Sequence, residues 1–210
     1  MEVSVSLGLV DLTPVTLEGR HVRLEPLSRE HTSQLAIVAL DPELWRFTPT
    51  QIHSTDDLDA YIETALSCQK AGTAIPFATV ERSTGRAIGS TRFGNIDPQN
   101  RRAEIGWTWL GRDFQRSHVN TEAKLLMLRH AFETWGCVRV ELKANARNDA
   151  SRRAMERIGA RYEGLLRRHS RLEDGTWRDT VYYSVLDSEW PGVRARLEQW
   201  VARGLTGSAP

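Results

Sequence analysis

The sequence predicts an α/β fold of the α+β kind, with helices flanking a mixed, mostly antiparallel sheet. Two observations support this. The hydrophobic period switches repeatedly between two and 3.6 residues, and strand-like segments come both in direct succession and in alternation with helix-like ones. The composition agrees, because 210 residues with 40% hydrophobic and 26% charged side chains suit one compact domain. We expect that domain at residues 15–203, with loose termini at 1–14 and 204–210.

The first half of the chain combines one strand, two helices and a strand meander. Val22 and Leu24 alternate with charged residues, which is typical of a half-buried strand. Turn-forming stretches separate the last three strands, so they predict an antiparallel meander. The expected elements are a strand over 21–27, helices over 29–40 and 55–70, and strands over 76–81, 86–97 and 103–110.

The second half alternates helices and strands. Leu125, Leu128 and Phe132 fall on one helical face, and Gly136 and Gly159 follow helix ends. The expected elements are a helix over 121–135, a strand over 138–143, a helix over 150–158, strands over 161–168 and 180–186, and a helix over 190–203. Together the two halves give a seven-stranded sheet. The apolar stripe of the last helix either closes the core or forms a dimer interface.

The charge balance excludes a general binder of long nucleic acids. Lys and Arg number 28 against 27 Asp and Glu, a net charge of +1. Residues 1–100 hold 8 basic against 13 acidic side chains, whereas 101–210 hold 20 against 14. The basic run at 167–171 has no interleaved aromatic residue and is interpreted as a solvated strand end, so no direct nucleic-acid partner is expected.

Membrane, metal and disulfide signals are absent from the sequence. The longest uncharged, apolar-leaning stretch, 71–80, is far shorter than the roughly 18 residues of a membrane-spanning helix. The first residues lack the basic start of a secretory signal, which favours a cytoplasmic location. Two cysteines without CxxC spacing and six scattered histidines predict neither a disulfide framework nor a metal site.

The junction between the strand over 103–110 and the next helix is the most informative stretch. A short polar loop there carries Arg112 and Arg116, and Asn120 is placed to cap a helix starting at Thr121. Loop amides at a helix N-terminus can bind a phosphate or pyrophosphate. An ordinary strand-to-helix loop with a good cap would give the same pattern, so both interpretations stay open.

Five segments in a fixed order carry a family resemblance. They are Leu-Glu-Gly-Arg-His-Val-Arg-Leu-Glu-Pro-Leu at 17–27, Ala-Glu-Ile-Gly-Trp at 103–107, Asn-Thr-Glu-Ala-Lys at 120–124, Asn-Asp-Ala-Ser-Arg-Arg-Ala-Met-Glu-Arg-Ile-Gly-Ala at 148–160, and Glu-Gly-Leu-Leu-Arg at 163–167. From Leu17 to about Arg203 the chain resembles the GNAT superfamily of acetyl-CoA-dependent N-acetyltransferases. The branch it resembles is that of the ribosomal-protein N-acetyltransferases RimJ and RimL. The resemblance implies a GNAT fold with splayed central strands.

The resemblance also implies an acetyl-CoA site in a V-shaped gap between 103–110 and 138–143. The pantetheine arm would pair with the backbone near Trp109, Leu110 and Gly111. The pyrophosphate would meet the loop and helix start formed by Gln115, Arg116, Ser117, His118, Val119, Asn120 and Thr121. His118 and Asn120 depart from the small residues of the family signature, although both types tolerate positive φ.

Asn148 and Ser151 match an Asn-x-x-Ser pattern that resembles residues beside the pantetheine arm or the sulfur. Helix capping is the alternative for Asn148, since it precedes a predicted helix. Ser151 lies further inside the helix, which favours a functional role. Many members of the family use a tyrosine as the acid at the position of Met155, so Ser151 is the remaining candidate donor to the thiolate.

Glu104 is the first choice for the general base, because the family often has a glutamate here that acts through a water. Strand alternation would place Glu104, Gly106, Thr108 and Leu110 on one face, with Ile105, Trp107 and Trp109 on the other. The alternative is a solvated charge beside Arg101 and Arg102. The Leu110 amide is the expected oxyanion donor.

The resemblance implies an N-acetyltransferase that works by direct attack in a ternary complex, without metal. Its acceptor would be a protein or peptide α-amino group. A small-molecule amine, or a catalytically degenerate CoA-binding protein, are the alternatives. The acidic half would supply much of the acceptor side, which suits a cationic amine, and a homodimer is in keeping with the family.

Overall fold

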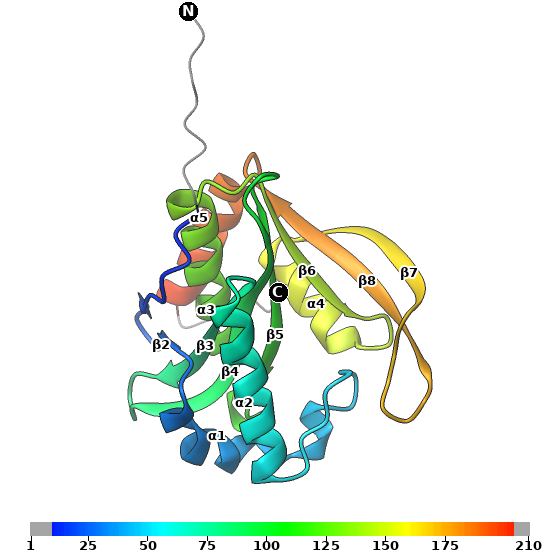
Figure 1. Cartoon of the computed structure of the whole chain (residues 1–210). Helices are drawn as coiled ribbons and strands as arrows, with labels where there is room; N and C mark the ends of the chain where they lie inside the picture. Colours follow the sequence, from blue (N-terminus) through cyan, green and yellow to red (C-terminus); the bar gives the residue numbers. More distant parts are fainter. Residues whose placement is uncertain (1–9, 204–210) are drawn as a thin grey trace, which may run out of the picture.

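The computed structural model describes residues 10–203 and arranges them as one twisted sheet with helices on both faces (Figure 1). Of the termini expected to be loose, 1–9 and 204–210 lie outside the described residues. The strands are β1 Leu17–Glu18, β2 Val22–Pro26, β3 Ala74–Glu81, β4 Arg86–Asp97, β5 Arg102–Leu110, β6 Arg139–Asn145, β7 Arg161–Arg171 and β8 Trp177–Leu186. The helices are α1 Thr32–Ala39, α2 Thr55–Lys70, α3 His118–Arg129, α4 Asp149–Ile158 and α5 Trp190–Ala202, with short 3-10 turns at Arg29–His31, Pro42–Leu44 and Arg112–Phe114.

The sheet has eight strands in the order β1-β2-β3-β4-β5-β6-β8-β7, rather than the seven expected. The additional strand is β1, which pairs Leu17 with Leu24 and Glu18 with Arg23. Two residues are too few to show a period of two, so the sequence pattern could not reveal it. The predicted meander of β3, β4 and β5 is antiparallel, as expected.

The one parallel pair among the described strands joins β5 to β6 and opens the sheet at its centre. It consists of Arg102 with Arg139, Ala103 with Val140, and Glu104 with Glu141. Beyond Glu104, β5 has no partner on this side, while β6 continues against β8 as far as Asn145. The two strands therefore splay apart, as the resemblance implied.

Two hydrophobic clusters cover opposite faces of the sheet. One holds α3 and α5, and the apolar stripe of α5 (Val193, Leu197 and Val201) lies within it. This assigns the stripe to the core. The other cluster holds α1 and α2 with Trp45, Ile52 and Trp109. Ahead of β1, Trp135 Nε1 donates a 3.1 Å hydrogen bond to the Asp11 carbonyl, which ties residues 10–14 to the first cluster.

The start of α3 differs from the prediction. Ser117, rather than Asn120, caps the helix, because its Oγ accepts from the Val119 amide at 3.2 Å and its backbone is extended. The helix therefore begins at His118, three residues before Thr121. At its other end it continues into a π-helical turn over His130–Thr134.

A β-bulge in β5 breaks the predicted alternation of side chains. Ser90 pairs with Trp109 and Arg92 with Gly106, so β5 carries an additional residue at Trp107, whose φ is +49°. Ile105 and Leu110 consequently lie in the α3 cluster, whereas Trp109 lies in the α2 cluster. The prediction that Thr108 and Leu110 share the Glu104 face is therefore wrong, because the inserted residue reverses the faces after Gly106.

Candidate active site

The splay between β5 and β6 leaves one backbone edge of β5, from Ile105 onward, without a strand partner among the described residues. Of the three residues expected beside the pantetheine arm, Trp109 and Leu110 have buried side chains that anchor this edge from opposite faces. The Gly111 amide donates to the Ile88 carbonyl at 2.9 Å, and its carbonyl accepts from Phe114. Gly111 therefore positions the loop, while the exposed edge before it can pair with an extended ligand.

The loop from Gly111 to Ser117 brings the N-terminus of α3 to the end of β5. Gln115 Nε2 donates to the Leu110 carbonyl at 3.0 Å, and Arg116 has a φ of +54°. Arg112 instead pairs with Asp41 at 2.9 Å, away from the helix start. A helix start leaves several amides without intrahelical partners, and the helix dipole adds a partial positive charge. Together these features can bind a phosphate.

His118 and Asn120 lie in the first turn of α3, where neither has positive φ. Burial, and next the charge of His21, lower the pKa of His118, whose ring centroid lies 4.2 Å from that of His21. Asn120 Oδ1 and Thr121 Oγ1 are enclosed, with no hydrogen-bond partner among the described residues.

Glu104 is a buried carboxylate at the base of the splay. Only 2% of its surface is exposed, and Oε2 accepts from Lys143 Nζ at 2.8 Å and from Asn95 Nδ2 at 2.6 Å. Oε1 lies toward Gly106, where a Cβ atom would come within 2.8 Å of it. The alternative of a solvated charge beside arginines is therefore wrong: Arg102 pairs with Asp97 and Glu141, and Arg101 donates to the Gly136 carbonyl.

Side chains around Glu104 that sequence reasoning missed form a basic and aromatic wall. The Trp107 ring has Arg92 Cζ at 5.0 Å and Lys143 Nζ at 5.8 Å. Arg92 also lies 5.0 Å from the Tyr61 ring on α2, and Lys143 lies 5.8 Å from the Tyr182 ring on β8. An arginine inside the otherwise uncharged run from Ala87 to Gly94 was the available signal. The wall differs from the acidic acceptor side that the charge of the first half suggested.

A second network supports the opposite face of the bulge. Lys124 on α3 is buried, and its Nζ donates to Thr108 Oγ1 at 2.7 Å and to Thr91 Oγ1 at 3.3 Å. Burial lowers the pKa of Lys124 to about 7, because no carboxylate compensates the loss of water. The lysine thus fixes β5 where the strand changes faces.

Asn148 and Ser151 meet at the start of α4. Asn148 Oδ1 accepts from the Ser151 amide at 3.0 Å, so its capping role is confirmed. The Ser151 hydroxyl has no hydrogen-bond partner among residues 10–203 and is half-buried. Met155 is buried in the core. The nearby phenol of Tyr183 donates to Glu156 at 2.8 Å.

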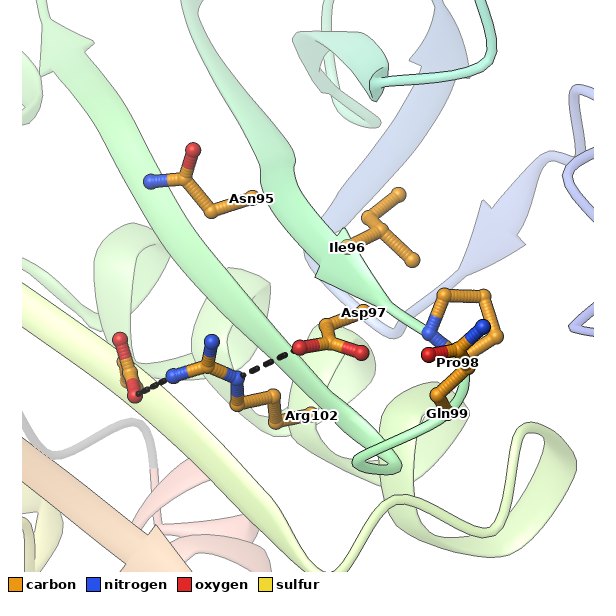
Figure 2. A pocket seen from close by; sticks show the side chains of 7 residues that line it. Asn95, Ile96, Asp97, Pro98, Gln99 and Arg102 are labelled. Atoms are coloured by element: carbon orange, nitrogen blue, oxygen red, sulfur yellow. Dashed lines mark hydrogen bonds and ion pairs between the residues drawn. The ribbon is translucent and has the colours of Figure 1, made fainter.

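A surface hollow of about 690 Å³ lies at the β4–β5 hairpin (Figure 2). Figure 2 shows the Arg102 guanidinium directed at the Asp97 carboxylate. Arg102 also pairs with Glu141 at 3.4 Å. Asn95 lines the hollow and also donates a hydrogen bond to Glu104. None of the residues expected to bind acetyl-CoA lines this hollow, so it is separate from the cleft.

Within residues 10–203, no group of three or more His, Cys, Asp or Glu side chains is arranged to hold a metal ion. The helices of this part of the chain are each too short or too polar to span a bilayer.

Comparisons with known proteins agree with this geometry. A family model of the acetyltransferase (GNAT) domain matches residues 21–161. YdaF of Bacillus subtilis (strain 168), named as a candidate ribosomal N-acetyltransferase, is 37% identical over 110 residues, or 52% of this chain and 59% of YdaF. The crystal structure of a GCN5-related N-acetyltransferase from Brucella melitensis covers 90% of this chain and 86% of its own, with 31% identity and a TM-score of 0.83.

RimJ of Mycobacterium smegmatis, solved in complex with CoA-disulfide, shares the fold with a TM-score of 0.77 and 23% identity, over 92% of this chain and 96% of that one. The family match covers well over half of the chain and includes β5, the loop after it and the start of α4. The chain therefore belongs to the GNAT family of acetyltransferases and is an acyltransferase.

Proposed function

We propose that the enzyme transfers the acetyl group of acetyl-CoA to the α-amino group of a protein or peptide, by direct attack in a ternary complex. The observation that carries the proposal is the buried Glu104 at the base of the splay, next to the unpaired edge of β5. The similarity to YdaF, which is named as a candidate ribosomal N-acetyltransferase, supports a protein acceptor. The unit that does this is the domain over residues 15–203.

In the proposed reaction, the amine nitrogen attacks the thioester carbonyl, the carbon–sulfur bond breaks, and an amide and CoA thiol are released. Glu104 accepts the amine proton, through a water, on Oε1, because Lys143 and Asn95 occupy Oε2. The Leu110 amide stabilises the oxyanion. The Ser151 hydroxyl stabilises the departing thiolate.

The co-substrate would extend along β5 toward α3. Trp109 and Leu110 would flank the pantetheine arm, and Gln115 to Thr121 would surround the pyrophosphate, with Asn148 holding Ser151 in place. The unpaired strand edge and the helix start fit these two parts of CoA, since the first needs backbone partners and the second needs amides. No metal takes part.

A coupled pair of experiments tests this function. Thiol release from acetyl-CoA is measured with peptides that have a free α-amine, with matched Nα-blocked peptides that contain lysine, and with small amines. Mass spectrometry then locates the acetyl group. Acetylation confined to free α-amines supports the proposal, and transfer to small amines alone would replace it with the small-molecule alternative.

Calorimetry with acetyl-CoA separates a silent enzyme from a degenerate one. Binding of acetyl-CoA without thiol release on any amine would favour a CoA-binding protein without catalysis.

A homodimer and a cytoplasmic location remain predictions. Light scattering of the purified chain would test the first, and fractionation of its host would test the second.

A further inference from the structure

Arg92 is a buried cation without an anionic partner. Its surface is 3% exposed, its Nε is enclosed without a hydrogen-bond partner, and no carboxylate among residues 10–203 forms an ion pair with it. The guanidinium lies instead 5.0 Å from the ring centroids of both Tyr61 and Trp107. Aromatic faces offset part of the cost of removing a charge from water, but a buried charge is ordinarily also paired.

The neighbours of Arg92 do not supply the missing charge. The Glu104 carboxylate is already matched by Lys143. Arg178 on β8 also lacks a carboxylate partner in the described part of the chain, and its Nε is enclosed. Burial lowers the pKa of Arg178, and the negative charge of Glu104 offsets only part of this shift. Among residues 10–203, Arg92 and Arg178 are thus two enclosed cations that no carboxylate pairs with, one lying against Trp107 and the other within the electrostatic reach of Glu104.

A further donor lies on the Lys143 face of β6. Asn145 lies two residues after Lys143 and therefore projects from the same face of the strand. It is buried, and its Nδ2 is enclosed without a partner among residues 10–203. Unsatisfied donors on three strands, β4, β6 and β8, are what an acceptor-rich anionic ligand would satisfy.

Acetyl-CoA does not bring this anion, because its charges lie on the phosphates. Arg92 pairs with Gly106, four residues before Leu110, where the loop toward α3 begins. Four residues of extended chain span roughly 13 Å. Arg92 lies on the α2 side of the sheet, against the rings of Tyr61 and Trp107. The anion therefore belongs to the second substrate.

We infer that the acceptor presents a carboxylate close to its reactive amine, and that Arg92 binds it, so that the preferred substrates are peptides with Asp or Glu at the first or second position. This inference rests on the proposed function. The two aromatic rings hold the guanidinium plane before binding, which suits the bidentate geometry of a carboxylate. Arg178 and Asn145 complete the polar surroundings of that group.

The test compares two peptides that differ only in Asp or Asn at the first residue. With the unmodified enzyme, kcat/KM for the Asp peptide should exceed that for the Asn peptide by roughly tenfold to a hundredfold, the effect of a charge-assisted bidentate contact. In Arg92→Gln this ratio should fall to about one. Arg86→Gln, an exposed arginine on the same strand, is the matched control and should keep the ratio.

The outcomes distinguish a failure of this inference from a failure of the proposed function. Transfer to peptides without an acidic preference overturns the inference and leaves the function standing. Absence of transfer to any amine, together with calorimetric binding of the Asp peptide that Arg92→Gln abolishes, overturns the function and leaves the carboxylate site standing. Preferential acetylation of free aspartate or glutamate over every peptide would overturn the peptide assignment. The peptide comparison needs no variant, so it remains decisive even where Arg92→Gln fails to fold.

Discussion

The two ends of the proposed substrate site, between β5 and β6, differ in the chemical groups that they offer. At the proposed cofactor end, the strand edge, the loop after β5 and the start of α3 offer mainly backbone groups. At the acceptor end, Glu104, Lys143 and Arg92 offer charged side chains that are buried or half-buried. Backbone groups persist when side chains change, whereas a buried charge depends on one residue. The comparison explains why His118 and Asn120 can depart from a glycine-rich signature: they lie in a regular helical turn whose amides are unaffected.

The largest expected effect is at the acceptor end. Glu104→Gln should lower kcat by about a hundredfold to ten-thousandfold, most strongly at low pH, because it removes the proposed proton acceptor. Acetyl-CoA binding, measured by calorimetry, should stay nearly unchanged. Glu141→Gln, on the paired residue of β6, is the control and should retain activity. An unaltered pH–rate profile in Glu104→Gln would remove this carboxylate from the mechanism.

The second-largest effect should be on stability, from the buried Lys124 beneath the bulge. Because burial lowers the pKa of Lys124 to about 7 in the folded chain, the unfolded chain binds more protons between pH 7 and about 10, so stability rises with pH there. The difference in unfolding free energy between wild type and Lys124→Met should change by up to about 1.4 kcal/mol per pH unit in this window. Below pH 7 the wild type carries the full free-energy cost of burying a protonated Lys124. Urea unfolding at a series of pH values measures this difference in unfolding free energy. Lys70→Met, at an exposed lysine, should show no such slope.

At the cofactor end the sharpest variant is Ser117→Ala. Loss of the cap should cost about 1 kcal/mol of stability and weaken acetyl-CoA binding severalfold, because the first turn of α3 loosens. Ser54→Ala removes the equivalent cap of α2, where Ser54 Oγ accepts from Asp57. It should lower the melting temperature similarly and leave the acetyl-CoA affinity unchanged. Equal affinity losses in both variants would trace the effect to general destabilisation.

The smallest effect should come from the two residues that depart from the family signature. His118→Gly and Asn120→Ala should change the Kd of acetyl-CoA less than about threefold, since a helix start binds phosphate through its amides. A tenfold change in either variant would show that the side chains themselves contact the co-substrate, and would weaken the contrast between the two ends.

Much of the fold was accessible from the sequence, because α2 shows a clear period of 3.6 residues and turn signals delimit β4, and both have the predicted bounds. Three features were not. A two-residue strand has no measurable period, and Ser117 and Asn120 are both good caps whose competition only tertiary packing decides. The bulge at Trp107 is one residue long and leaves no compositional mark.

The candidate site was predicted in part. Glu104 and the loop after β5 followed from motif order, but the wall around Glu104 draws Tyr61, Arg92, Lys143 and Tyr182 from α2, β4, β6 and β8. These residues are distant in sequence, so no local spacing connects them. An arginine within an apolar strand was the one local sign that a buried cation needed explaining.

The single inserted residue at Trp107 divides β5 into two segments with opposite phase. In the proposed function, the residues of β5 up to Gly106 face the amine that is modified, and those after the insertion face the acyl donor. Substitutions in one segment need not disturb the other. A lineage of such enzymes could therefore change what it acetylates by altering a few residues before the insertion, while it keeps the same donor and the same core.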